Sequence, residues 1–123
     1  MLIDDLPRFA PVAGHFHDVP FYVSREMFGG VPIEIAGGEI AHLVETPVAA
    51  THRHDCPEIY LLLSPSPKGA VIEVEVNDQI FTVVSPAAFY VPAGAPHRFV
   101  TRRAERGSYC LGVLLPRASS GGA

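Results

Sequence analysis

Three histidines and one glutamate in this sequence have the types and spacing of a metal site. His52 and His54 stand two positions apart in the segment THRHDCPE, which ends in Glu58, and His97 follows the turn segment PAGAP. Side chains two positions apart on an extended backbone point to the same face, so both imidazoles of the first segment can aim at one point. Neutral imidazoles and a carboxylate suit Fe²⁺, Mn²⁺, Ni²⁺, Co²⁺ or Zn²⁺. We therefore expect one divalent transition metal per chain, with coordination positions left open for substrate, water or dioxygen.

The alternative interpretation is that these four residues are unrelated polar side chains on turns, but their order and local context favour the metal site. His15 and His17 repeat the His-x-His spacing in a proline-rich segment, and we do not expect them to form a ligand pair. His42 stands on an expected strand and is interpreted as a core or pocket histidine, not a fifth ligand. Cys56 lies between the ligands with no activating base in view, which favours a structural or exposed thiol.

Three apolar or aromatic residues share the inward parity of the expected ligands. Tyr60 and Leu62 have the parity of Glu58, and Phe99 has that of the last histidine. They either line a substrate pocket together with His42 or simply pack in the core. Tyr60 is the better pocket candidate because a buried hydroxyl needs a hydrogen-bond partner.

The elements that must position these residues are short strands. Eleven glycines and twelve prolines divide the chain into short pieces, which argues against long helices. The segment VIEVEV at 71–76 alternates strictly, and Asn77-Asp78 supplies a tight turn into 79–84. Further strands are expected at 21–24, 31–36, 39–45, 48–54, 58–63, 89–91, 98–102 and 109–115, with a helix over 23–28 as the main alternative to the first. The pattern predicts an all-β double-sheet jelly roll or barrel.

The two histidine segments resemble the paired motifs of the cupin superfamily. The first motif, His-x-His and then Glu, is matched by His52, His54 and Glu58, and the second, Pro-x-Gly-x-x-His, by Pro92, Gly94 and His97. The resemblance covers roughly residues 35 to 115. The departures from the family pattern fall in turns and not on ligands: Thr46, Pro65, Pro86-Ala87 and Thr101.

The resemblance implies a cupin-type double-stranded β-helix, that is, a jelly-roll barrel with the metal inside, commonly as a homodimer. It favours Fe²⁺ and an enzyme of the dioxygenase or oxygenase class that acts on a small organic molecule. A non-redox isomerase, cyclase or lyase, similar to polyketide-cyclase tailoring cupins, is the alternative, and a small-molecule-binding cupin without turnover is the third. If Glu58 is only loosely bound it could act as the general base; Tyr60 and His42 are the weaker candidates.

Composition limits the remaining function classes. The formal net charge is −4 with nine Lys and Arg in total, so the basic stripe of a nucleic-acid binder is lacking. No apolar run approaches the roughly 18 residues of a membrane span, and the N-terminus does not have the pattern of a signal peptide. These features, with two cysteines expected as reduced thiols, predict a cytoplasmic protein. We expect an irregular arm at 1–20, one barrel domain at 21–117 and a disordered tail at 118–123.

Overall fold

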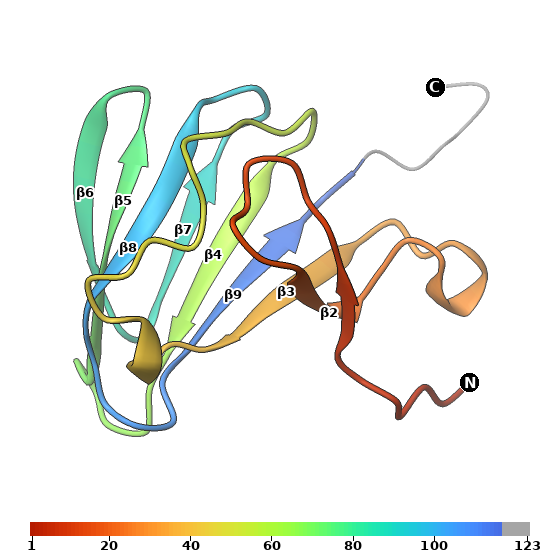
Figure 1. Ribbon diagram of the computed structural model, residues 1–123, viewed down its shortest axis with the longest axis horizontal. Helices are drawn as coiled ribbons and strands as arrows, with labels where there is room; N and C mark the ends of the chain where they lie inside the picture. Colours follow the sequence, from red (N-terminus) through yellow and green to blue (C-terminus); the bar gives the residue numbers. More distant parts are fainter. Residues whose placement is uncertain (117–123) are drawn as a thin grey trace.

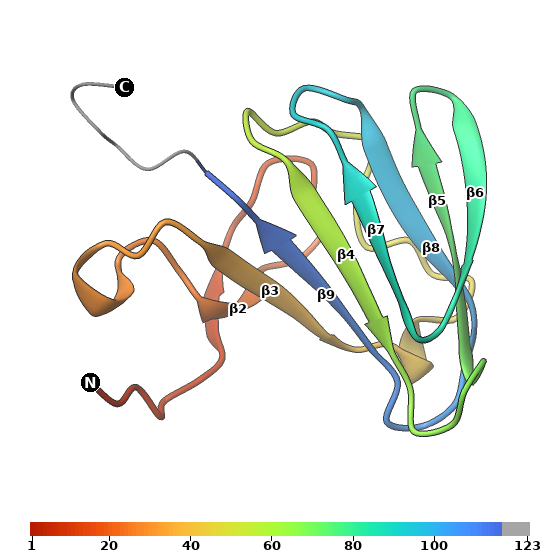
Figure 2. The ribbon, with the colours of Figure 1, turned by 180° about the vertical axis from the view of Figure 1, so that it is seen from behind.

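The computed structural model describes residues 1–116 as two antiparallel β-sheets that face each other (Figures 1 and 2). The larger sheet has six strands in the order β1-β2-β3-β9-β4-β7, and the smaller has three in the order β6-β5-β8. This arrangement confirms the expected all-β double-sheet fold. No helix in the described part of the chain is long and apolar enough to cross a membrane. The elements are β1 Arg8–Ala10, β2 Val19–Val23, η1 Met27–Gly29, β3 Glu34–Glu39, η2 Ala41–Leu43, β4 Glu58–Leu63, β5 Ala70–Val76, β6 Gln79–Val84, β7 Ala87–Val91, β8 His97–Ala104 and β9 Tyr109–Leu114.

The β5–β6 hairpin has the geometry that its sequence predicts. Asn77 and Asp78 adopt φ angles of 50° and 66°, and Val76 pairs with Gln79 across the turn. Two central residues with positive φ give a turn whose twist matches that of the flanking strands. The alternation in β5 is equally regular, because Ile72 and Val74 are completely buried between the sheets.

Two of the expected strands are absent, and the sequence-based prediction was wrong there. Residues 39–45 leave β3 and curl into the short 3₁₀ helix η2, because the Glu39 carboxylate accepts hydrogen bonds from the backbone N–H groups of Ala41 and Gly107, each at 2.9 Å. Residues 48–54 are extended but have no continuous neighbour. They form only isolated bridges, in which Ala49 pairs with His15 and His52 pairs with His97.

The N-terminal arm is more regular than expected. Its residues include β1 and the start of β2, which extend the six-stranded sheet beyond β3 (Figure 1). The alternative of a helix over 23–28 is not realised: β2 ends at Val23, and a single 3₁₀ turn, η1, follows. The tail expected at 118–123, and the last residue of the expected barrel domain, lie outside the described residues.

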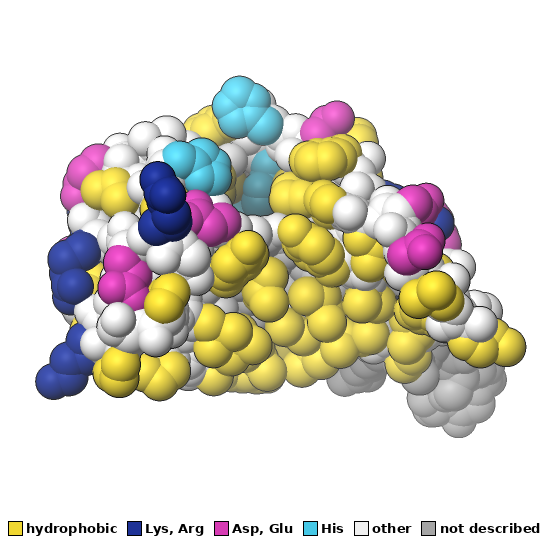
Figure 3. All heavy atoms as spheres, turned by 90° about the horizontal axis from the view of Figure 1, so that it is seen from below, with side chains coloured by type: hydrophobic (Ala, Val, Ile, Leu, Met, Phe, Trp, Pro, Cys, Tyr) yellow, Lys and Arg dark blue, Asp and Glu magenta, His cyan; other side chains and the backbone are white. Residues whose placement is uncertain are grey.

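The outer faces of the two sheets differ in chemistry. On the three-stranded sheet, Arg98 on β8 pairs with Glu75 on β5 at 2.8 Å, and Arg102 pairs with Glu73 at 2.9 Å. On the six-stranded sheet, the outward positions of β4 and β9 are apolar. Figure 3 shows hydrophobic side chains gathered in a band across the lower half of the picture. The first face is therefore suited to water, and the second is not.

Shortening a core side chain of β5 should destabilise the protein far more than the same change on the exposed side of the hairpin. We expect Ile72→Ala to lower the free energy of unfolding by about 2–5 kcal/mol, because it leaves a cavity between the sheets. The matched change Ile80→Ala, at a side chain that is 64% exposed, should alter it by less than about 0.5 kcal/mol. Urea unfolding followed by circular dichroism measures both, and equal effects would contradict the placement of β5 in the core.

Candidate metal centre

A pair of backbone hydrogen bonds brings the two histidine segments together. The N–H of His52 donates to the carbonyl of His97 at 3.0 Å, and the N–H of His97 donates to the carbonyl of His52 at 2.8 Å. A third bond, from the N–H of Gly94 to the carbonyl of His54 at 2.8 Å, fixes the turn before β8 against the same loop. Gly94 has a φ of 79°, which a residue with a side chain rarely adopts. The irregular loop at 51–57 is thus held at the head of β8.

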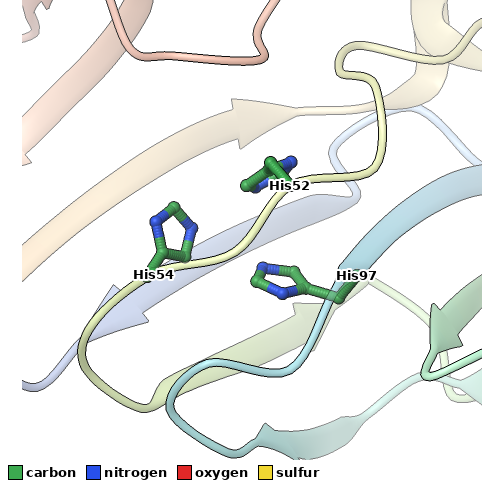
Figure 4. Close-up of side chains that lie close together, drawn as sticks. All are labelled: His52, His54 and His97. Carbon is green, nitrogen blue, oxygen red and sulfur yellow. The ribbon is translucent and has the colours of Figure 1, made fainter.

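The three imidazole rings point toward one another (Figure 4). Each of His52, His54 and His97 offers one ring nitrogen, and these nitrogens lie within 4.8 Å of one another. The ring centroids of His52 and His97 are 4.6 Å apart, and those of His54 and His97 are 5.1 Å apart. The structure thus brings all three predicted histidines into one cluster.

Hydrogen bonds orient two of the rings. The Nδ1 of His52 lies 2.7 Å from the carbonyl oxygen of Ala50, and the Nδ1 of His97 lies 2.8 Å from that of Ala95. An Nδ1–H that donates to a backbone carbonyl leaves Nε2 free as an acceptor or ligand. Both rings therefore present Nε2 for coordination.

Glu58 reaches the cluster from the opposite sheet. Its Oε1 lies 2.9 Å from the Nε2 of His97 and 3.4 Å from the Nε2 of His54. Burial opposes ionisation of the carboxyl group, but the hydrogen bonds with these two histidines outweigh it and lower the pKa of Glu58 to about 2. The glutamate is therefore a carboxylate at neutral pH, as a metal ligand must be.

Glu58 also affects the rings around it. Burial works against protonation of His97, yet its hydrogen bonds with Glu58 and with the Ala95 carbonyl raise its pKa. The pKa of His52 is lowered, mainly by burial and against the effect of the Ala50 carbonyl. Because the Nδ1–H of His97 is already committed to Ala95, a hydrogen bond from Nε2 to Glu58 requires a doubly protonated ring. A divalent cation is the other partner that satisfies both this nitrogen and the carboxylate, so the donor set fits a metal ion.

Gly112 on β9 makes room for the Glu58 carboxylate. Neither histidine motif predicted a role for this glycine. A Cβ at this position would collide with Oε2 of Glu58. Gly112 pairs with Tyr60 in the adjacent strand, so the absence of a side chain on β9 leaves the inner face of β4 open beside Glu58.

A largely apolar cavity of about 480 Å³ adjoins the cluster, within the size range of small-molecule sites. Tyr60 and Phe99 both line it, and their rings are 5.1 Å apart. His42 also lines it but projects from η2 at the exposed edge, 3.4 Å from a Glu39 oxygen. Leu62, expected as a pocket residue, is completely buried in the core and is not part of the cavity wall, because it lies deeper between the sheets.

Three further groups, of which Tyr60 and Cys110 line the cavity, are neutral at physiological pH. Burial raises the pKa of Tyr60 well above 10, and the phenol stays protonated. Burial also raises the pKa of Cys110 to about 12 and raises that of Cys56. Neither thiol has the depressed pKa of a nucleophile, which agrees with the structural role expected for Cys56.

One member of the N-terminal His-x-His pair lies beside the cluster, a position that sequence reasoning missed. The ring centroid of His15 is 4.9 Å from that of His52, and His15 lines the cavity. Burial, followed by the charge of His52, lowers the pKa of His15 to about 4. The repeated His-x-His spacing was the only signal in the sequence, and nothing in it indicated that the arm folds back over the loop at 51–57.

Solved structures of low sequence identity share this fold. A cupin 2 conserved barrel domain protein from Salinispora arenicola matches with a TM-score of 0.58 and 17% identity, over 83% of this chain and 76% of its own. A cupin superfamily protein from Desulfitobacterium hafniense gives 0.51 and 19% over 70% and 69%, and KdgF from a Halomonas species gives 0.52 and 14% over 91% and 88%. No family model matches the sequence, and no curated protein is significantly similar to it. The chain therefore has a cupin-like β-barrel fold.

The depressed pKa of Glu58 predicts a specific loss of stability in acid for the metal-free protein. The carboxylate contributes stability above its ordinary pKa of 4.5, and this contribution is lost as pH falls from 4.5 toward about 2. In Glu58→Gln this contribution is missing, so the free energy of unfolding should fall less between about pH 6 and about pH 3 than in wild type. The same substitution at exposed Glu26 should leave the wild-type dependence unchanged. Urea unfolding at the two pH values, with a chelator present, makes the comparison, and identical slopes for all three proteins would contradict it.

Proposed function

We propose that this chain is a metal-dependent cupin enzyme that acts on a small organic molecule. One divalent transition metal, with Fe²⁺ favoured, would be held by His52, His54, Glu58 and His97. The observation that supports this most directly is the convergence of three imidazole nitrogens and a carboxylate at the wall of an apolar cavity. Buried polar groups weaken a core unless they are paired, so apolar side chains would be the simpler filling for this position.

The metal and the residues around the site would have different roles in the reaction. A bound divalent metal would supply Lewis-acid polarisation of an oxygen atom or, if redox-active, electron transfer to dioxygen. Tyr60 and Phe99 pack edge to face and shield one side of the cavity from water. Tyr60 keeps its proton and can donate a hydrogen bond. Glu58 is ionised, and its carboxylate contacts the Nε2 atoms of His97 and His54.

We favour an oxygenase, and specifically a dioxygenase, on the resemblance to cupins, and the apolar wall suits an aromatic or enolic substrate. A non-redox isomerase, cyclase or lyase is the second candidate. The buried phenol of Tyr60 beside the cluster supports this candidate, because the phenol could donate a proton to the substrate. The metal and dioxygen requirements of the activity distinguish an oxygenase from a non-redox enzyme. Activity that needs iron and dioxygen would support the first, whereas full activity with zinc under anaerobic conditions would assign the second. A ligand that binds and is never altered would instead assign a binding protein without turnover.

Metal content tests the ligand set directly. Protein purified without an affinity tag that binds metal should contain about one transition-metal ion per chain. His52→Ala and His97→Ala should each lose most of it, because each removes one of the nitrogen donors. His42→Ala is the matched control and should retain the metal, since its ring lies at the exposed edge of the cavity. Elemental analysis measures the content and circular dichroism checks the fold; retention of metal by folded His52→Ala and His97→Ala would overturn the assignment.

We further propose that the protein is a homodimer, joined through the outer face of the six-stranded sheet. One row of cross-strand neighbours on this face consists of Ile35, Val113, Ile59 and Tyr90, and the next of Gly37, Leu111, Leu61 and Ala88. Neither row contains a charged residue, and the Tyr90 side chain is 57% exposed. An uncharged apolar surface is complementary to itself about a two-fold axis, so a second copy of this chain is the partner that fits it.

A charge placed at the centre of this face should separate the subunits. We expect Leu61→Glu to raise the dimer dissociation constant by at least about 30-fold, because it buries an unpaired carboxylate in the interface. The control Thr82→Glu adds the same charge on the exposed strand β6 of the other sheet and should leave the dimer intact. Light scattering over a dilution series gives the mass of each, and a monomeric wild type would overturn the proposal.

A further inference from the structure

The N-terminal arm is fastened to the loop that carries the first two histidines. His15 forms an antiparallel bridge with Ala49. The N–H of Phe16 donates to the carbonyl of Val48 at 3.1 Å, and the N–H of Ala50 donates to the carbonyl of Gly14 at 2.8 Å. These bonds fix the position of the arm beside the cluster, although the two segments are far apart in the sequence.

Gly14 allows the arm to approach His52 closely. Its φ is +85°, and a Cβ built on it would lie 3.0 Å from the Cβ of His52. Because no side chain intervenes, the next residue, His15, brings its imidazole to the edge of the cluster. Among the described residues, the convergent nitrogen donors belong to His52, His54 and His97, and His15 is not one of them.

Within the described residues, no hydrogen bond explains the position of the His15 side chain. It is half-buried at the cavity wall, and within residues 1–116 neither of its ring nitrogens is hydrogen-bonded, in contrast to His52 and His97. An apolar side chain would fill this place without leaving two polar atoms unpaired. Both ring nitrogens are therefore available to a molecule in the cavity.

The rest of the cavity wall limits what that molecule can be. Much of the wall is apolar and includes Phe9, Val12, Phe21, Ile40, Leu43 and Phe99. Within residues 1–116 no lysine or arginine lines the cavity, so this part of the chain does not supply the residues that usually bind phosphate or several carboxylates. The polar side chains of the lining are imidazoles, the phenols of Tyr22 and Tyr60, and the carboxylates of Asp18, Glu39 and Glu58.

We propose that His15 is a substrate-binding residue, and that the substrate is a small aromatic or enolic molecule that carries its oxygen atoms at one end. The oxygen end lies at the histidine cluster, where His15 hydrogen-bonds one oxygen, and the apolar end lies against the aromatic wall. This inference rests on the proposed function, because it requires a metal in the same site. It adds a residue from outside both cupin motifs, and it gives the N-terminal arm a role in recognition.

The test uses the full chain loaded with Co²⁺ and 4-nitrocatechol as an aromatic probe with two adjacent oxygens, whose visible spectrum changes when it binds a metal. Replacing His15 by Phe keeps a ring of similar size and removes both hydrogen-bonding nitrogens. We expect this variant to bind the probe about tenfold more weakly than wild type, with its Co²⁺ affinity unchanged. The control is Ala13→Phe, which adds the same phenyl ring at an exposed position of the same arm that does not line the cavity, and it should bind the probe as wild type does.

Other outcomes would contradict the role of His15, the substrate class or the metal site separately. Unchanged probe affinity in His15→Phe, or equal weakening in Ala13→Phe, would remove His15 from the substrate site. A parallel loss of Co²⁺ affinity in His15→Phe would make His15 a metal ligand instead. A wild-type protein that binds Co²⁺ but not the probe would overturn the substrate class. A wild-type protein that does not bind Co²⁺ would overturn the proposed function itself, so the two failures are distinguishable.

Discussion

The contact between Glu58 and His97 is the constraint on which the site depends, because it joins the two sheets of the fold. Glu58 begins β4 in the six-stranded sheet, His97 begins β8 in the three-stranded sheet, and their side chains meet at 2.9 Å with His97 only 1% exposed. Placing an ionised carboxylate and a basic ring at this depth costs stability unless both are paired. The barrel thus carries a paired, ionisable element inside an apolar core, and such departures from an apolar interior concentrate at functional sites.

The surrounding structure keeps these groups in place. The backbone bridge between His52 and His97 substitutes for a sheet ladder, so a loop with no strand of its own is positioned as firmly as an element. Carbonyls at Ala50 and Ala95 set the ring orientations, and the missing side chain at Gly112 leaves space for the carboxylate. A metal site needs both its ligands and the groups that orient them, and here the backbone supplies much of that second set.

The sequence could predict features that depend on neighbouring residues, such as turn type and the alternation of side chains along a strand. The β5–β6 hairpin follows from strict alternation and Asn77-Asp78, and the shared direction of His52 and His54 from their spacing on extended chain. The addition of His97 to them was predicted from the resemblance to the second cupin motif. Contacts between distant segments decided the rest. Residues 39–45 become a 3₁₀ turn because Gly107 reaches the Glu39 carboxylate from another loop. The place of His15 depends on its bridge to Ala49, and that of Gly112 on its register against β4, neither of which a single segment encodes.

Strand β4 links the site to the proposed subunit contact, because its alternate residues serve opposite faces. Tyr60 and Leu62 point inward with Glu58, whereas Ile59 and Leu61 point outward, and both sets are apolar apart from the glutamate. Strand β5 differs: its outward glutamates are paired with arginines from β8. An apolar run such as IYLLL fits a strand that is covered on both sides, and the alternation of VIEVEV fits one that faces water. The contrast argues that the six-stranded sheet is the covered one, so that its partner would pack directly behind the strand that carries Glu58.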